Sequence, residues 1–271
     1  MTSTVLLSAL FSGLIAIFAS VSIEKFGGRL GGLLGSLPTT IIPASVGFWL
    51  TSHSIQEATD ALYAVPPGMM VTACFLLCWR ILPERIPTRS LRIRLMWMTL
   101  ISLFVWSLAA VLMVLSLRTL PLSMAFIGSM TFLIQIGVGA WACANNPPAP
   151  KGQNRVRMAV YVARGGLAAA AIGVSVWMSS LGVPLLAGIF SVFPAIFLTT
   201  MVSVWLSQGQ AVQAGAVGPL ILGSASVSAF SIASAILVPV TGLAAGSLIA
   251  WFAAVGLVSV PAWAWLKQQR T

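Results

Sequence analysis

The chain has few of the side chains that catalysis or metal binding requires. Its 271 residues include only four Asp and Glu, one His and three Cys, and 7% of the residues are charged. These residues form no Ser-His-Asp set, glycine-rich phosphate loop or metal-ligand motif, so we expect no enzyme activity, no metal and no cofactor. Cys74 and Cys78 lie one helical turn apart and Cys143 lies far away in the sequence, which favours packing roles for all three.

Polar surface is also scarce, which excludes an ordinary water-soluble domain. Hydrophobic residues make up 59% of the chain, and the mean hydropathy is +1.02. Because a helix needs roughly 20 apolar residues to cross the hydrocarbon core, the sequence predicts an all-α polytopic membrane protein. We expect nine transmembrane helices, the first of them a mature helix and not a cleaved signal. Their ranges are 4–22, 30–51, 60–82, 95–117, 122–144, 158–180, 183–206, 212–237 and 242–266.

The few charges are mostly basic and are unevenly distributed among the loops. The net charge of +10 would suit a nucleic-acid-binding protein, but most basic residues fall in odd-numbered loops or the C-terminal tail. They are Lys25, Arg29, Arg80, Arg85, Arg89, Arg92, Arg94, Lys151, Arg155, Arg157, Lys267 and Arg270. Only Arg118 falls in an even-numbered loop. This bias predicts that the N-terminus lies outside and the C-terminus in the cytoplasm, and it argues against a nucleic-acid partner.

The lipid bilayer is therefore the first partner that the sequence predicts. The basic run 80–94 is expected to contact anionic lipid head groups, each cation contributing about 1 kcal/mol near the surface.

One segment of the sequence occurs twice. Residues 30–50 reappear 156 positions later as residues 186–206, with Pro38 matching Pro194 and Trp49 matching Trp205. Five predicted crossings separate the copies, so they enter the membrane from opposite sides and the repeat is inverted. We expect a first four-helix repeat at 1–117, a linking helix and cytoplasmic loop at 118–157, and a second, inverted four-helix repeat at 158–271.

Prolines interrupt the repeated segments at matched positions. Pro38 and Pro194 each remove a backbone donor and free the carbonyls of Leu34 and Phe190. In hydrocarbon such carbonyls need a partner from the protein, from water or from a ligand. The pairs Pro66-Pro67 and Gly218-Pro219 predict further breaks in the third and eighth helices. The candidate substrate-binding residues are Pro38, Thr39, Thr40, Pro67, Pro194, Thr199, Thr200, Pro219 and Arg164.

A plainer interpretation of the same residues is a set of kinked, tightly packed helices whose hydroxyls bond their own backbone. Gly27, Gly31 and Gly35 lie four apart and form a small-residue ridge that would let helices approach closely.

Arg164 is a basic residue within a predicted transmembrane helix. It lies about two turns into the sixth helix, where its repeat mate is Ser8. Its side chain either reaches the interface by snorkelling or faces a cavity and pairs with an anionic substrate group.

The acidic residues near the outer surface have a simpler explanation than a functional site. His53, Glu57 and Asp60 would share a helical face, which leaves a metal or proton-relay site open. However, Ser54-x-x-Glu57 is typical of a capping box that starts a helix near Ile55. Since no carboxylate falls at mid-membrane, the sequence does not indicate carboxylate-driven coupling.

The second copy resembles a known family of membrane proteins. Residues 187–197 (AGIFSVFPAIF) are similar to the AG-x4-FP-x2-F segment of GlpM-type proteins, which are small four-helix bacterial inner-membrane proteins of unassigned function. The first copy departs from that pattern at Gly31, Leu37 and Thr39. The resemblance implies a multi-pass protein of the bacterial inner membrane, built as a fused pair of such units with the fifth helix inserted to invert the second. It supplies no substrate.

Two functions are compatible with these features. The first is a secondary transporter or permease for a small polar or anionic solute, working by alternating access about the inverted repeat. The second is a non-transporting membrane scaffold, assembly or lipid-handling protein that uses the glycine ridge for protein contacts.

Overall fold

The computed structural model describes residues 2–26, 37–87, 90–145 and 158–268, and in these ranges the chain is helical without strands. Seven helices in the described ranges are long and apolar enough to cross a membrane. They are Ile55–Ile81, Leu91–Thr119, Met124–Ala144, Met158–Ser180, Pro184–Leu206, Gln210–Thr241 and Leu243–Gln268. Two shorter apolar helices, Ser3–Phe18 and Ile41–Thr51, overlap the first two predicted spans. The all-helical class is confirmed, and its apolar helices fit a polytopic membrane protein.

The first half of the chain contains the helices up to α7. They are α1 (Thr2–Phe26), α3 (Ile41–Thr51), α4 (Ile55–Tyr63), α5 (Val65–Ile81), the 3₁₀ turn η1 (Pro83–Arg85), α6 (Leu91–Thr119) and α7 (Met124–Ala144). Helix α4 begins at the predicted cap, because the Ser54 hydroxyl accepts a hydrogen bond from the Glu57 amide at 3.1 Å. The Glu57 carboxylate accepts from the His53 amide at 2.9 Å, one residue earlier than a capping box requires.

The second half continues from α8. Its elements are α8 (Met158–Ser180), α9 (Pro184–Ser191), α10 (Ala195–Gln208), α11 (Gln210–Thr241), α12 (Leu243–Ala254), the π-helical turn η2 (Val255–Ser259) and α13 (Val260–Gln268). Elements α12, η2 and α13 follow one another directly and form the last apolar span.

Two of the predicted proline breaks lie where the sequence places them. Pro38 lies in non-helical chain just before α3, and Pro194 lies between α9 and α10. The third span is interrupted at Ala64, one residue before α5, and Pro66 and Pro67 fall in the first turn of α5. Proline is tolerated there because the amides of a first helical turn have no partner within the helix.

The predicted break in the eighth span is wrong. Helix α11 runs without interruption through Pro219. Its neighbour Gly218 lies directly against α7, where an added Cβ would lie 2.9 Å from the Ala142 carbonyl. This close packing holds α11 against its neighbours, and a membrane helix tolerates proline when neighbouring helices cover the freed backbone group.

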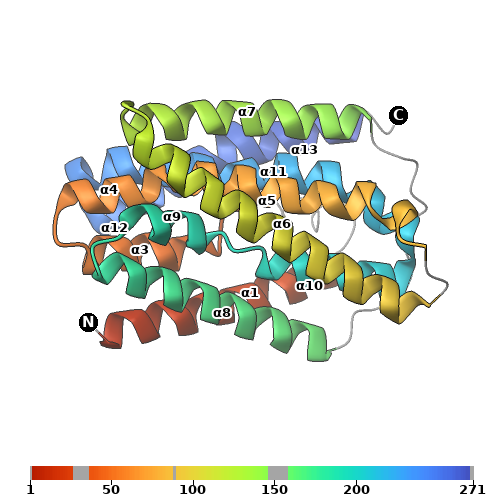
Figure 1. The fold of residues 1–271 in the computed structure, drawn as a ribbon. Coiled ribbons are helices and arrows are strands. Elements are labelled where there is room, and N and C mark those ends of the chain that lie inside the picture. The colour runs from red at the N-terminus through yellow and green to blue at the C-terminus, as the bar shows by residue number, and fades with distance from the viewer. Residues whose placement is uncertain (1, 27–36, 88–89, 146–157, 269–271) are drawn as a thin grey trace.

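The helices pack roughly side by side, with α1 and α8 along one edge and α7 along the opposite edge (Figure 1). Helix α1 packs mainly against α8, and α5 packs against α11 at the centre of the bundle. Helix α7 contacts both α5 and α11, while α6 covers α5 and α12 covers α11. The largest fully buried side chains include Trp79, Phe48, Phe75 and Phe230.

The two ends of the bundle differ in the loops that they carry. Helix α1 begins at one end, together with the α3–α4, α6–α7 and α8–α9 connections, whereas η1 and the end of α13 lie at the other end (Figure 1). Arg80 and Arg85 therefore lie at the opposite end from Arg118, the last residue but one of α6. This separation agrees with the charge asymmetry seen in the sequence.

Candidate functional site

The break between α9 and α10 leaves a carbonyl that another helix satisfies. The Phe190 carbonyl is not free, because the Phe193 amide donates to it at 3.0 Å. The group that needs an external partner is the Val192 carbonyl, which accepts a hydrogen bond from the Thr72 hydroxyl at 2.9 Å. The sequence thus predicted the break correctly and named the wrong carbonyl.

Aromatic side chains surround this hydrogen bond. The Trp106 indole donates to the Thr72 hydroxyl at 3.1 Å. Its ring meets Phe193 edge-on at 5.0 Å and Phe190 at 5.9 Å between centroids. The two phenylalanine rings stack at 5.7 Å. Helices α5 and α6 therefore hold the break with one relayed hydrogen bond and an aromatic cluster.

Glycines bring the interruptions of the third and seventh spans together. A Cβ on Gly68 would lie 2.6 Å from Val192 Cγ2 and 2.9 Å from the Ile189 Cα. A Cβ on Gly188 would overlap the Ala61 carbonyl oxygen. Helix α9 therefore lies directly on the α4–α5 joint, and the two interrupted spans meet there.

Arg164 is buried in the helix bundle. It is 9% exposed, and its Nε donates to the Thr199 hydroxyl of α10 at 3.2 Å. This bond holds the side chain against α10, so simple snorkelling into solvent does not describe it. The burial of Arg164 argues against the snorkelling alternative, and its pairing with an anionic substrate group stays a prediction.

The threonine hydroxyls of α10 also bond their own helix. Thr199 Oγ1 lies 2.9 Å from the Ile196 carbonyl and 3.0 Å from that of Ala195. Thr200 Oγ1 donates to the Ile196 carbonyl at 2.7 Å. The plainer interpretation therefore accounts for Thr200, whereas Thr199 additionally accepts from Arg164.

The remaining candidates are placed around the breaks. Pro38 is buried, the Thr39 amide donates to the Leu37 carbonyl at 2.9 Å, and Thr40 directly precedes α3. Pro67 is buried in the first turn of α5, and Pro219 is half-buried in α11. Of these candidates, Arg164 and Thr199 are joined by a hydrogen bond. The glycine ridge at 27–35 and the carbonyl of Leu34 lie outside the described residues.

A polar contact between α7 and α11 was not predicted. Gln135 is fully buried near the middle of α7. Its Nε2 donates to Ser224 Oγ at 3.2 Å, and its Oε1 accepts from Ser228 Oγ at 2.6 Å. The signal in the sequence was an amide within an apolar run, opposite serines spaced four apart.

Polar groups at the α3–α4 end are structural. His53 Nδ1 lies 3.2 Å from Glu57 Oε2, and Gln56 Nε2 donates to Asp60 at 2.9 Å, all on the exposed start of α4. Across the described ranges, no three His, Cys, Asp or Glu side chains lie close enough to hold a metal ion. The capping interpretation is therefore the one that the geometry favours.

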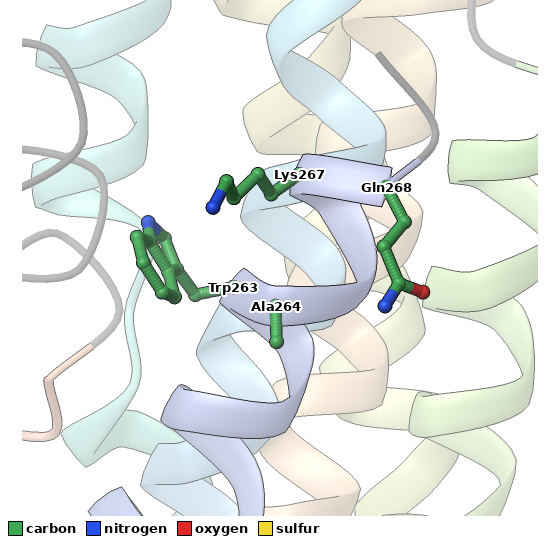
Figure 2. Close-up of a pocket in the computed structure, with 4 residues that line it drawn as sticks. All are labelled: Trp263, Ala264, Lys267 and Gln268. Carbon is green, nitrogen blue, oxygen red and sulfur yellow. The ribbon is translucent and has the colours of Figure 1, made fainter. Parts of the chain in front are cut away.

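A shallow depression lies on the surface of α13, at the end of the last span. It is lined by Trp263, Ala264, Lys267 and Gln268, and its volume is about 230 Å³. Figure 2 shows Trp263 and Lys267 on one side of the helix and Gln268 on the other. The Lys267 ammonium lies 5.9 Å from the Trp263 ring centroid. A tryptophan with a lysine at a helix end is typical of an anchor at the membrane interface.

Comparison with known proteins gives no relative for this chain. No family model, no curated protein and no solved structure matches it. The resemblance to GlpM-type proteins stays a prediction.

Proposed function

We propose that this protein is a secondary transporter or permease for a small polar or anionic solute in the bacterial inner membrane. It would have nine transmembrane helices in an inverted 4+1+4 repeat and would work by alternating access about that repeat. Its N-terminus would be outside and its C-terminus in the cytoplasm. The observation that carries the proposal is the register in which α1 crosses α8.

In that crossing, residues related by the sequence repeat touch one another. Gly13 and Ala169 are 156 positions apart, the same offset as the repeated segments. A Cβ on Gly13 would lie 3.2 Å from the Ala169 Cβ. Two residues related by a two-fold axis come into contact only where the axis passes between them. The contact therefore supports an axis through this crossing.

The contacts on either side of Gly13 and Ala169 are related by the same two-fold exchange of α1 and α8. A Cβ on Gly165 would lie 2.6 Å from Ile17 Cγ1, and a Cβ on Gly173 would lie 3.2 Å from the Ala9 Cβ. Applying the offset of 156 positions exchanges these two pairs, since Ala9 matches Gly165 and Ile17 matches Gly173. This exchange supports an inverted relation of α1 and α8.

Each repeated tryptophan contacts a central helix of the other proposed half. Trp49 of α3 donates to the Ser234 hydroxyl of α11 at 3.3 Å. Trp205 of α10 meets Trp79 of α5 edge-on at 6.1 Å between centroids. Helices α5 and α11 are mates in the proposed repeat, and α7, the proposed linker, packs against both.

Two features favour transport over a static scaffold: the interrupted helices and the buried Arg164, both close to the proposed axis. Interrupted helices near an axis of pseudo-symmetry are the usual place of a transporter's binding site. Arg164 lies five residues from Ala169, or about 7.5 Å along α8 at 1.5 Å per residue. Burying a cation among membrane helices costs free energy, and such residues usually mark a functional site.

The test is solute flux in a deletion strain that carries either wild-type protein or a variant. Uptake and efflux are measured for a panel of small anionic, neutral and cationic solutes. We expect wild type to restore flux of at least one solute and Arg164→Ala and Pro194→Ala to lower it. No solute phenotype for wild type, together with stoichiometric co-purification of a partner protein, would instead support the scaffold, assembly or lipid-handling alternative.

A further inference from the structure

Tyr161 is a second buried polar residue on the face of α8 that carries Arg164. It is 5% exposed, and its hydroxyl has no hydrogen-bond partner. Buried polar atoms are nearly always paired with protein or water. An unpaired phenol inside an apolar bundle is therefore a group whose partner is not part of the described chain.

The spacing places Tyr161 next to Arg164. Residues three apart on a helix are neighbours, with Cβ atoms about 5–6 Å apart. Both side chains are buried on α8, and the Arg164 Nε is held by Thr199 of α10. The buried residues of this face run on through Gly165 and Ala168. A phenol and a guanidinium thus share one buried strip of α8.

The symmetry-related strip of α1 lacks both groups. With the offset of 156 positions, Tyr161 corresponds to Val5 and Arg164 to Ser8. Ser8 is buried against α3, where its hydroxyl lies 2.9 Å from the position of a Cβ on Gly47. Because α1 packs through small and apolar residues at the equivalent positions, packing alone does not require a tyrosine and an arginine on α8.

We infer that the Tyr161 hydroxyl and the Arg164 guanidinium recognise a small oxyanion, either a carboxylate or a phosphate-like group. The inference rests on the proposed function, because it names the substrate class of the same site. A guanidinium binds such groups through several donors at once, and a phenol adds one more O–H donor. Thr199 positions the arginine by accepting from its Nε. A ligand with acceptor oxygens would supply the partner that the Tyr161 hydroxyl lacks.

The first experiment measures anion binding to the purified full-length protein in detergent. Thermal unfolding is followed with inorganic phosphate, acetate and, as a neutral probe, glycerol. We expect phosphate or acetate to raise the Tm of wild type. Tyr161→Phe should weaken anion binding by about tenfold, the effect of one hydrogen bond to a charged group. Without anion, this variant should unfold no earlier than wild type, because it buries no unpaired hydroxyl.

Matched variants separate recognition from folding. The chain has one other tyrosine, Tyr63 in α4, and Tyr63→Phe should leave the anion response unchanged. General salt effects on the Tm act on all variants alike and cancel in this comparison. Arg164→Lys keeps the charge but loses the planar donor set, so it should weaken anion binding more than Tyr161→Phe.

The inference fails if Tyr161→Phe and Arg164→Lys both respond to phosphate and acetate as wild type does. A second measurement, flux into liposomes, distinguishes this failure from that of the proposed function. Flux of a neutral solute that does not depend on Arg164 would overturn the inference and leave transport intact. Anion binding that is lost in Tyr161→Phe, without flux of any tested solute, would uphold the recognition site and overturn transport.

Discussion

The Thr72 hydroxyl on α5 donates to the Val192 carbonyl at the break between α9 and α10, over 2.9 Å. This hydrogen bond joins the third span, two turns into α5, to the point where the seventh span is interrupted. It supplies the partner that a freed carbonyl requires in hydrocarbon. Because Trp106 donates to the same hydroxyl, Thr72 serves as acceptor and donor at once, and no apolar side chain can replace it without leaving two polar groups unpaired.

Thr72→Val should therefore destabilise the protein by about 2–4 kcal/mol, since it leaves a buried carbonyl and a buried indole N–H without partners. Thr72→Ser keeps the hydroxyl and should recover most of that loss. The measurement is reversible unfolding in mixed micelles. Thr131→Val is the matched control, because the Thr131 hydroxyl bonds only carbonyls of its own helix in the described contacts. Equal losses at Thr72 and Thr131 would contradict the role given to Thr72.

Because α9 lies so close to the α4–α5 joint, we expect a larger side chain at Gly188 to destabilise the protein. Gly188→Ala should cost about 1–3 kcal/mol, because the added methyl meets the Ala61 carbonyl and Ala64. The control is Gly166→Ala on α8, where a Cβ has open space around it. That variant should be neutral or stabilising by up to about 1 kcal/mol, the helix preference of alanine over glycine. Indistinguishable stabilities for the two variants would show that α9 is not packed as tightly as described.

The contact between α7 and α11 depends on Gln135. Replacing Gln135 with Leu should lower stability by about 0.5–2 kcal/mol, the range measured for hydrogen bonds between membrane helices. The cost is limited because Ser224 already donates to the Ile221 carbonyl of its own helix. A double-mutant cycle with Ser228→Ala isolates the bond between Gln135 and Ser228. Strictly additive effects in that cycle would show that the bond contributes nothing.

Features with local causes were predictable from the sequence, and features with distant partners were not. Proline fixes its own φ and removes its own donor, so the breaks at Pro38 and Pro194 could be located without knowing the fold. Pro219 carries the same local signal, but packing of Gly218 on Ala142 outweighs it. The partner of Thr72 lies 120 residues away in the sequence, and no pattern near Thr72 points to it.

Arg164 illustrates the same limit within one residue. Its position two turns into a helix was visible in the sequence, and both an interfacial and an inward-facing side chain were compatible with it. The choice depends on Thr199, which α10 presents only after the break at Pro194 has set the direction of that helix. Gly13 and Ala169, which contact one another, are 156 positions apart, the same offset as the repeated segments 30–50 and 186–206.

The orientation predicted from the basic loops can be measured by cysteine labelling. Cys74, Cys78 and Cys143 are first replaced by Ala. In the proposed topology, Ile55→Cys lies outside and reacts with a membrane-impermeant thiol reagent in intact spheroplasts. Glu84→Cys lies in the cytoplasm and reacts only after permeabilisation. Both side chains are exposed, so access depends on the side of the membrane. The reverse pattern of labelling would invert the topology and place the basic loops outside.

Pro194, which lies at a helix break, and Pro219, which lies inside a continuous helix, should respond differently to replacement by alanine. Pro194→Ala restores an amide at the break and lets α9 and α10 join, so we expect about a tenfold loss of solute flux, equivalent to about 1.4 kcal/mol. Pro219→Ala should retain flux, because α11 is already continuous there. Hydrogen–deuterium exchange checks the physical cause, since amides around 190–196 should exchange more slowly in Pro194→Ala. If flux falls equally in both variants while exchange at the break is unchanged, the interruption between α9 and α10 is not what transport requires.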